Sequence, residues 1–137
     1  MERTVIIVKP DGMEKNLAAA VLERFAKAGL RLVGCKMVQL DEKVLRDHYA
    51  HHADKPFFPE LVSYMRSCPV LVCILEGDNV INRVRDLAGP TDSKLALKGT
   101  IRGDMGEDKS RNVIHASDSP ESAQAEIRRF FKPEEVF

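Results

Sequence analysis

The chain has 137 residues, the usual size of one domain, and we expect a single domain over residues 1–137. Its 21 basic and 21 acidic side chains give a formal charge of zero, which argues against a broad phosphate-tracking surface for nucleic acid. A composition of 44% hydrophobic and 31% charged residues excludes a disordered chain and is typical of a globular protein.

The alternation of apolar runs and helical periodicities predicts strands and helices in turn. In chain order we predict a strand over 5–8, a helix over 15–28, a strand over 30–40, helices over 42–50 and 56–66, a strand over 68–75, a helix after Asp78, a strand over 113–116 and a helix from Pro120. This order predicts an α+β fold, a ferredoxin-like four-stranded antiparallel sheet covered by helices.

Residues at the ends of the predicted helices support these assignments. Gly29 and Gly89 follow apolar helical patterns and are typical helix stops. Asp41, Asp78 and Ser119 precede such patterns and are predicted N-caps, because their side-chain oxygens can accept from the free amides of a first turn. Between these helices, residues 90–111 contain little periodic signal, and an irregular loop of that length is often functional.

The cysteines and the N-terminal residues predict the compartment. Cys35, Cys68 and Cys73 form no Cys-x-x-Cys pair and each lies in an apolar context, which predicts buried free thiols. The N-terminal sequence MERTVIIVKP lacks the apolar core of a signal peptide, and no apolar stretch approaches the roughly 18 residues of a membrane span. We therefore expect a cytoplasmic protein without a membrane partner.

The candidate catalytic residue is His115, at the end of the predicted strand over 113–116. A helix begins about four residues later, and the free amides at its N-terminus suit an anion such as phosphate. Glu126 lies about two turns into this helix, so its carboxylate can reach one ring nitrogen and leave the other free to attack an electrophile. Taken alone, a histidine at a strand end is more often structural, so the assignment needs supporting groups.

Cationic and polar side chains flank the same region of the sequence. They are Lys9, Arg85, Thr91, Arg102 and Asn112. Phosphoryl transfer requires positive charge around the equatorial oxygens of the phosphoryl group, which guanidinium groups supply well. Basic residues are also common as ordinary surface charges, and the spacing of these residues does not distinguish a phosphate site from such a surface. No Walker motif is present, so phosphate needs another mode of binding.

A cluster of rings between the predicted helices has two interpretations. His48, His51 and His52 have spacings compatible with a metal, but no fourth ligand is evident, so we expect a solvated helix end rather than a zinc site. Phe57 and Phe58 are both candidates for the core.

Five separated motifs resemble those of nucleoside diphosphate kinases in order and nearly in spacing, over almost the whole chain: KPDG, HYAHHADKPFF, GPTDS, GTIRGD and NVIHASDSPESA. The resemblance implies a ping-pong enzyme, in which a nucleoside triphosphate, mainly ATP, gives its terminal phosphoryl group to a histidine and a nucleoside diphosphate collects it. His115 matches that histidine, and Glu126 matches the carboxylate that orients it.

The same resemblance implies roles for the other candidate residues. Lys9 and Tyr49 would lie beside the phosphates and ribose, Phe57 would stack on the base, Arg85, Thr91 and Arg102 would hold phosphate oxygens, and Asn112 would bind the sugar hydroxyl. Magnesium would be held mainly by the phosphates, with Asp118 contacting it through water and no dedicated protein cage. The resemblance also implies a homo-oligomer, a tetramer or hexamer.

Four positions and one loop depart from the family pattern. Cys68 stands where many members have glycine, and the loop GPTDSKLALKG differs from the commoner TNP version. Ala116 stands where glycine is common after the histidine, so the backbone there needs a negative φ. Lys98 stands where proline is usual, and Lys109 where some members carry an apolar residue against the base. These departures bear on loop shape, subunit contacts and base affinity.

Two other functions are compatible with parts of the sequence. The same pocket would serve a non-catalytic phosphohistidine relay or a nucleotide-binding module. A ferredoxin-like interaction or RNA-binding domain is the third alternative, but the sequence lacks paired sheet aromatics and a basic stripe.

Overall fold

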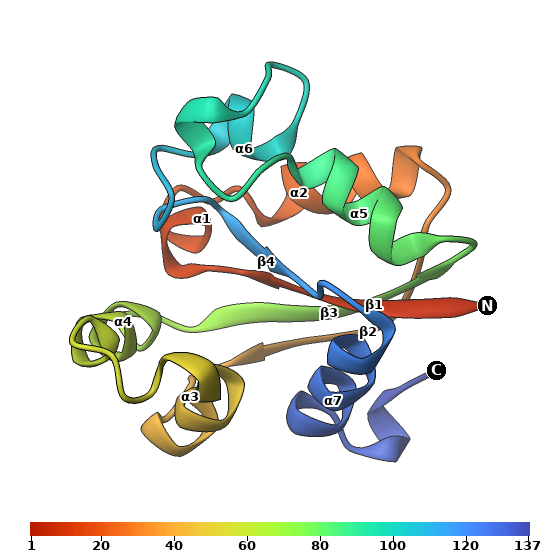
Figure 1. The fold of residues 1–137 in the computed structure, drawn as a ribbon. Helices are drawn as coiled ribbons and strands as arrows, with labels where there is room; N and C mark the ends of the chain where they lie inside the picture. The colour runs from red at the N-terminus through yellow and green to blue at the C-terminus, as the bar shows by residue number, and fades with distance from the viewer.

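The computed structural model describes residues 1–137, and its centre is one antiparallel sheet (Figure 1). The strands are β1 (Glu2–Val8), β2 (Arg31–Val38), β3 (Val70–Gly77) and β4 (Ile114–Ala116). Their order in the sheet is β2-β3-β1-β4, with every neighbouring pair antiparallel. The predicted fold class, a four-stranded antiparallel α+β sheet covered by helices, is therefore confirmed.

Helices cover both faces of this sheet (Figure 1). Helices α2, α5 and α6 lie on one side, and α3, α4 and α7 lie on the other. The helices are α1 (Pro10–Glu14), α2 (Ala18–Lys27), α3 (Glu42–His48), α4 (Phe58–Met65), α5 (Val80–Ala88), α6 (Ile101–Met105) and α7 (Pro120–Phe130), with short 3-10 turns η1 (Ala50–His52), η2 (Ser93–Leu95) and η3 (Pro133–Glu135).

The sheet divides the hydrophobic core into two clusters of 16 and 13 buried residues. In β1, Ile6 and Val8 belong to the cluster shared with α2 and α5, whereas Val5 and Ile7 belong to the cluster shared with α3 and α4. Successive side chains of a strand point to opposite faces, so a strand covered on both faces is apolar throughout. This explains the continuous run Val5–Val8 that predicted a buried strand.

Most predicted helix ends are confirmed. The Asp41 side chain accepts a hydrogen bond from the amide of Val44 at 2.8 Å, and Gly29 and Gly89 have φ values of 80° and 85°. The predicted N-cap Asp78 is wrong. The residue before α5 is Asn79, in the left-handed conformation with φ 54° and without a side-chain cap.

The structure adds short helices that the sequence pattern did not predict. Pro10, whose fixed φ suits a first helical position, begins α1 within the KPDG motif. Asn16 has φ 58°, so the helix predicted over 15–28 begins only at Ala18. The predicted irregular loop over 90–111 contains η2 and α6.

The prediction of buried thiols holds for one cysteine only. Cys73 is buried, Cys68 is partly buried and Cys35 is exposed. None of the helices has the length and apolar character needed to cross a bilayer.

Candidate active site

His115 and Glu126 meet as the sequence predicted. Strand β4 carries His115 opposite Ile7 of β1, and α7 carries Glu126. Nε2 of His115 lies 3.0 Å from each carboxylate oxygen of Glu126. An ionised carboxylate accepts only, so this contact places the proton on Nε2 and leaves the Nδ1 lone pair free. The imidazole is 22% exposed, whereas the Glu126 side chain is only 8% exposed.

The start of α7 explains why Glu126 reaches the ring. Ser119 caps this helix, because its hydroxyl accepts from the amide of Ser122 at 3.1 Å, as predicted. Ser117, between β4 and the helix, donates its hydroxyl to Oε1 of Glu126 at 2.6 Å and accepts from the amide of Val5 at 3.2 Å. The carboxylate is thus held from the sheet as well as from its own helix.

His48 is a buried neighbour of His115, which corrects the expectation of a solvated helix end for this residue, whereas His51 is exposed. The two rings are 4.6 Å apart, with their planes at 74°. Arg129 donates to Nδ1 of His48 at 3.0 Å, so the proton of a neutral ring lies on Nε2, which is buried without a partner. Burial, together with the nearby His115 and Arg129, lowers the pKa of His48 to about 2. This ring is therefore neutral over the physiological range.

A series of ring contacts leads from His115 to Phe57. After His48, the ring of Tyr49 follows at 4.6 Å, His52 at 6.4 Å and Phe57 at 5.2 Å, each distance measured from the preceding ring. Phe58 is buried in the core, whereas Phe57 is 47% exposed, so the two phenylalanines have different environments. Burial raises the pKa of Tyr49 to about 12, and the Glu126 charge acts in the same direction, so its hydroxyl stays protonated.

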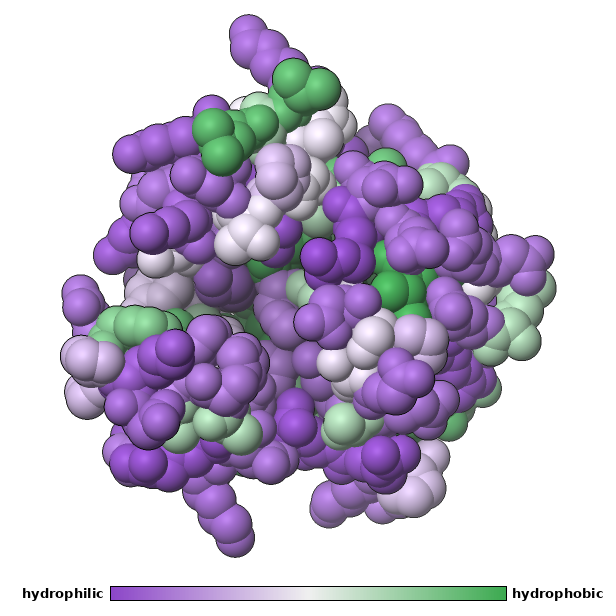
Figure 2. All heavy atoms as spheres, viewed as in Figure 1, coloured by the Kyte–Doolittle hydropathy of each residue, from purple (hydrophilic) through white to green (hydrophobic).

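The predicted phosphate-binding residues surround one cavity. Arg85, Thr91, Arg102 and Ala116 are among the residues that line this volume of about 520 Å³, which places it beside the residue that follows His115. In the view of Figure 2 the molecular surface is hollowed near its centre. The cavity combines two guanidinium groups and two threonine hydroxyls, which are donors suited to an anion, with one carboxylate, Asp86.

Arg102 is anchored by backbone carbonyl groups. It donates to the oxygens of Gly89, Ile114 and Asn112 at 2.9, 2.8 and 3.3 Å. A guanidinium has five N–H donors, so donors remain for a ligand. Burial, and then the charge of Arg85, lowers the pKa of Arg102 to about 10, and the group is still cationic at neutral pH.

Lys9 and Asn112 form a second polar group that joins this region. Nζ of Lys9 donates to Oδ1 of Asn112 at 2.8 Å and to the carbonyl of Ser110 at 2.7 Å. The Asn112 amide donates to the carbonyl of Thr91 at 3.0 Å. Burial lowers the pKa of Lys9 to about 8, although the Asp11 carboxylate opposes this shift. The Lys9 ammonium is therefore still mostly charged at neutral pH but loses its proton in the mildly alkaline range.

Asp11 is a site residue that the sequence reasoning missed. Val113, two positions before His115, has φ 74°, an uncommon conformation for a β-branched side chain. Its amide donates to Oδ2 of Asp11 at 3.0 Å, and the Tyr64 hydroxyl donates to Oδ1 at 2.5 Å. The carboxylate thus fixes the backbone that leads into β4. The KPDG motif contains Asp11, but a sequence motif does not show that the partners of this carboxylate are Val113 and Tyr64, which are distant in the sequence.

Other missed residues are Ser117, His48, Tyr64 and Arg129. Ser117 lies next to His115 in the HASDS motif, but several hydroxyls occur there and spacing alone does not tell which one faces Glu126. Arg129 follows Glu126 on the same helix, and only the packing of α3 against α7 brings it to His48.

Comparisons with known proteins match almost the whole chain to one family. Residues 2–136 match the family model described as nucleoside diphosphate kinase. Nucleoside diphosphate kinases of Parabacteroides distasonis and Saccharomyces cerevisiae are 48% and 49% identical to this chain, over 100% and 98% of it and 90% and 88% of their own lengths. A halophilic nucleoside diphosphate kinase from Halobacterium salinarum, solved with CDP, gives a TM-score of 0.96 at 43% identity, covering 99% of this chain and 91% of its own. The Aquifex aeolicus nucleoside diphosphate kinase gives 0.93 at 46% identity, over 99% of both chains.

The fold is shared with solved nucleoside diphosphate kinases, which are phosphotransferases, and it places an oriented histidine close to a cavity lined by two arginines. With the whole-chain match, these features assign the chain to the nucleoside diphosphate kinase family. Its reaction is accordingly the transfer of a terminal phosphoryl group between nucleoside triphosphates and diphosphates.

Proposed function

We propose that the transfer proceeds in two steps through a phosphohistidine on His115, with ATP as the main donor. Nδ1 attacks the γ-phosphorus, the new N–P bond forms as the bond to the β,γ-bridging oxygen breaks, and the diphosphate leaves. A second diphosphate then attacks the same phosphorus and restores the imidazole. The observation that carries this proposal is the Nε2–Glu126 contact at 3.0 Å to both oxygens, because it leaves Nδ1 unprotonated and the ring oriented.

The proposed nucleotide contacts follow the cavity and the ring series. Arg85, Thr91 and Arg102 hold the phosphate oxygens, where their positive charge and hydroxyl stabilise the charge that develops during transfer. Lys9 and Tyr49 bind the phosphates and ribose, Asn112 binds the sugar hydroxyl, and Phe57 stacks on the base. The exposed ring of Phe57 supports this role, because stacking on a π face accepts every base. The CDP bound to the Halobacterium salinarum relative is in keeping with a nucleotide ligand.

The proposal includes magnesium carried by the phosphates. Magnesium prefers six oxygen ligands, whereas the close cluster of metal-ligand side chains in this chain contains two imidazoles, His48 and His115, with Glu126. That cluster does not fit a magnesium cage. Asp118 fits a contact through water, since it is exposed and hydrogen bonding from Ser122 lowers the pKa of its carboxyl. When bound, magnesium would offset the negative charge of the phosphate oxygens. Removal of magnesium with EDTA should therefore stop transfer.

We further propose that the chain assembles as a tetramer or hexamer. Leu95 and Leu97 support this, because they are 74% and 78% exposed and lie between Lys94 and Lys98. Figure 2 shows hydrophobic side chains at the top of the molecule, near α6 of Figure 1. Burial against another copy would remove this apolar surface from water.

Incubation with γ-radiolabelled ATP and then with GDP tests the catalytic proposal. Wild-type protein should acquire an acid-labile label and release it as labelled GTP. His115→Ala should fold normally but take up no label and show no exchange. The matched control is His51→Ala, which removes an exposed histidine of η1 and should leave exchange unchanged. Exchange retained in His115→Ala would exclude His115 as nucleophile.

The same experiment separates the other two functions. A stable label on His115 that GDP does not remove would favour a phosphohistidine relay over turnover. An RNA-binding role has less support, because helices cover both faces of the sheet (Figure 1) and its strands carry no Phe, Tyr or Trp.

A further inference from the structure

One guanidinium and one carboxylate hold the peptide groups at Gly99, just before α6. Arg24, in the last turn of α2, donates to the carbonyl oxygen of Gly99 at 3.1 Å and to Oδ2 of Asp104 at 2.7 Å. The other oxygen of Asp104, Oδ1, accepts from the amide of Gly99 at 2.9 Å. We call these three residues the α2–α6 clasp, because they join α2 to the first residues of α6 and the residue that precedes it.

The contacts of the clasp are charged and satisfy the backbone at a turn. The Gly99 amide, and after it the Arg24 guanidinium, lowers the pKa of the Asp104 carboxyl. An arginine side chain stays protonated in proteins, so the contact is an ion pair at neutral pH. Gly99 has φ 100°, a conformation that favours glycine. The clasp thus holds the chain at the point where it turns into α6.

The clasp lies beside the phosphate cavity and is connected to it through the backbone. Thr100 and Arg102 line that cavity, whereas the three clasp residues do not. Arg102 lies two positions before Asp104 in a helix of only five residues. A helix this short has few hydrogen bonds of its own and depends on outside contacts for its position. A movement of Asp104 therefore moves Arg102 as well.

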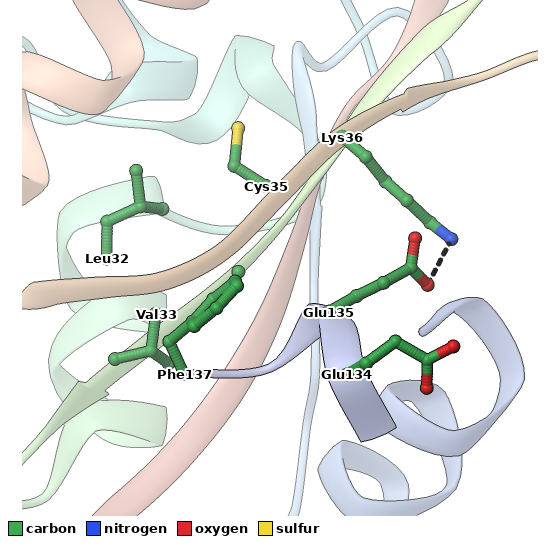
Figure 3. A pocket seen from close by; sticks show the side chains of 8 residues that line it. Leu32, Val33, Cys35, Lys36, Glu134, Glu135 and Phe137 are labelled. Carbon is green, nitrogen blue, oxygen red and sulfur yellow. Dashed lines mark hydrogen bonds and ion pairs between the residues drawn. The ribbon is translucent and has the colours of Figure 1, made fainter. Parts of the chain in front are cut away.

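A similar ion pair elsewhere in the protein has no such connection. Figure 3 shows a pocket of about 570 Å³ between β2 and the C-terminal residues, in which Lys36 pairs with Glu135 at 3.0 Å. These two side chains are 30% and 33% exposed, close to the 29% of both Arg24 and Asp104. None of the residues that line this pocket is a candidate site residue. An ion pair of this kind does not by itself indicate a function, whereas the connection of the clasp to Arg102 does.

We propose that Arg24 is a positioning residue for phosphoryl transfer, because the α2–α6 clasp holds α6 where Arg102 faces the cavity. This role rests on the proposed function, in which Arg102 holds phosphate oxygens. Without the clasp, α6 samples other positions, and Arg102 must be ordered when the nucleotide binds. That ordering opposes binding, so the loss appears in the KM for nucleotide more than in kcat.

The kinetic test compares Arg24→Gln with Lys27→Gln in ATP-to-GDP exchange. Both substitutions remove one positive charge from the last turn of α2, but Lys27 is exposed and pairs with Glu23 of the same helix. Arg24→Gln should raise the KM for nucleotide about tenfold and change kcat by less than about twofold, and Lys27→Gln should change neither. Arg24→Lys, which keeps the charge but lacks the planar fork, should give an intermediate KM.

A second comparison, in an Arg102→Gln background, shows whether Arg24 acts through Arg102. There Arg24→Gln should have no further effect on the KM, because the side chain that it positions is already absent. An equal rise in both backgrounds would overturn the proposal, since independent residues have additive effects. If Arg102→Gln raises the KM but Arg24→Gln does not, the clasp alone is refuted. If Arg102→Gln leaves exchange unchanged, the proposed function of Arg102 fails too.

A measurement without turnover follows the clasp directly. Partly exposed ion pairs contribute little to global stability, so Arg24→Gln should unfold at nearly the wild-type urea concentration. Amide hydrogen exchange of residues 97–105 in nucleotide-free protein should be faster in Arg24→Gln than in wild type or Lys27→Gln. Asp104→Asn breaks the same clasp while leaving α2 unchanged, and should behave as Arg24→Gln does. Equal exchange in all four proteins would show that the clasp does not hold α6.

Discussion

The orientation of His115 depends on a single carboxylate held by several groups. Glu126→Gln removes the negative charge while keeping the side-chain size, and Ser117 can still donate to its oxygen. The His115 ring then loses its charged partner, and we expect the transfer rate to fall about 100-fold without being abolished. The measurement is kcat for ATP-to-GDP exchange. Ser117→Ala should have a smaller effect, and an unchanged rate in Glu126→Gln would remove this residue from the mechanism.

The proposed contact between Lys9 and the nucleotide, with the lowered pKa of Lys9, predicts how nucleotide affinity changes with pH. Because burial lowers the pKa of Lys9 to about 8, its ammonium loses charge as the pH rises through that value. The KM for nucleoside diphosphate should therefore increase above about pH 8 in the wild type. Lys9→Gln should have a higher KM at neutral pH and lack this increase. Parallel pH profiles for the two proteins would argue against a role for the Lys9 charge.

At the scale of elements, α1 fixes the entry to β4. Asp11→Asn removes a carboxylate acceptor from the Val113 amide and the Tyr64 hydroxyl. Since a buried polar group left without its partner costs about 1–3 kcal/mol, we expect the free energy of unfolding to fall by that amount and kcat to fall with it. Urea unfolding and exchange assays measure the two effects. Asp54→Asn, at an exposed position, is the control and should change neither.

The elements show which parts of the fold the sequence encodes locally. Apolar periodicity and the residues Asp41, Ser119 and Gly29 marked strands and helix ends, because each acts within a few positions along the chain. The left-handed Asn79 has no side-chain cap, and the helix at Pro10 is joined to Val113 and Tyr64 through Asp11, so neither has the usual local signal of a helix start. Short helices also carry too few residues for a periodic signal.

The candidate site likewise contains contacts that are encoded locally and contacts that depend on long-range packing. The spacing from His115 to Glu126 is set within one strand-to-helix connection, so helix geometry was enough to pair them. His48 comes from α3, and its burial follows from long-range packing against His115 and Arg129. Sequence spacing gave the local cluster of histidines but no information about that contact.

At the scale of the whole molecule, the lowered pKa of His48 predicts that the folded protein loses stability in acid. Its pKa is about 2 in the folded chain and 6.5 when unperturbed, so the unfolded state binds more protons between these values. The free energy of unfolding should fall as the pH drops below 6.5, by up to about 1.4 kcal/mol per pH unit from this group.

Urea unfolding at several pH values measures this effect. His48→Asn should show a smaller slope between pH 6.5 and about 5, where most carboxylates remain ionised. His52, whose pKa burial also lowers, is present in both proteins and cancels in the comparison. Equal slopes would show that His48 is accessible to protons in the native protein.

The proposed assembly gives a second prediction at this scale. Light scattering should give a mass that is a multiple of the 15.4 kDa chain, four or six copies. If the exposed leucines are buried between copies, Leu95→Ser with Leu97→Ser should lower that mass at the same protein concentration. Glu23→Ser, an exposed position on α2, is the control. A monomer in the unchanged protein would exclude the assembly.

Arg102 connects the proposed phosphate site to the edge of the sheet through the backbone carbonyl groups to which it donates. Strand β4 is three residues long, the last in the sheet, and only β1 pairs with it. Arg102 donates to the carbonyl of Ile114 within this strand and to the carbonyl of Asn112 just before it, much as a further strand would. A polyphosphate bound as proposed would use the guanidinium donors that these carbonyls leave free. Ligand binding in the pocket would therefore act on Arg102, the same side chain that supports the short strand and the imidazole on it.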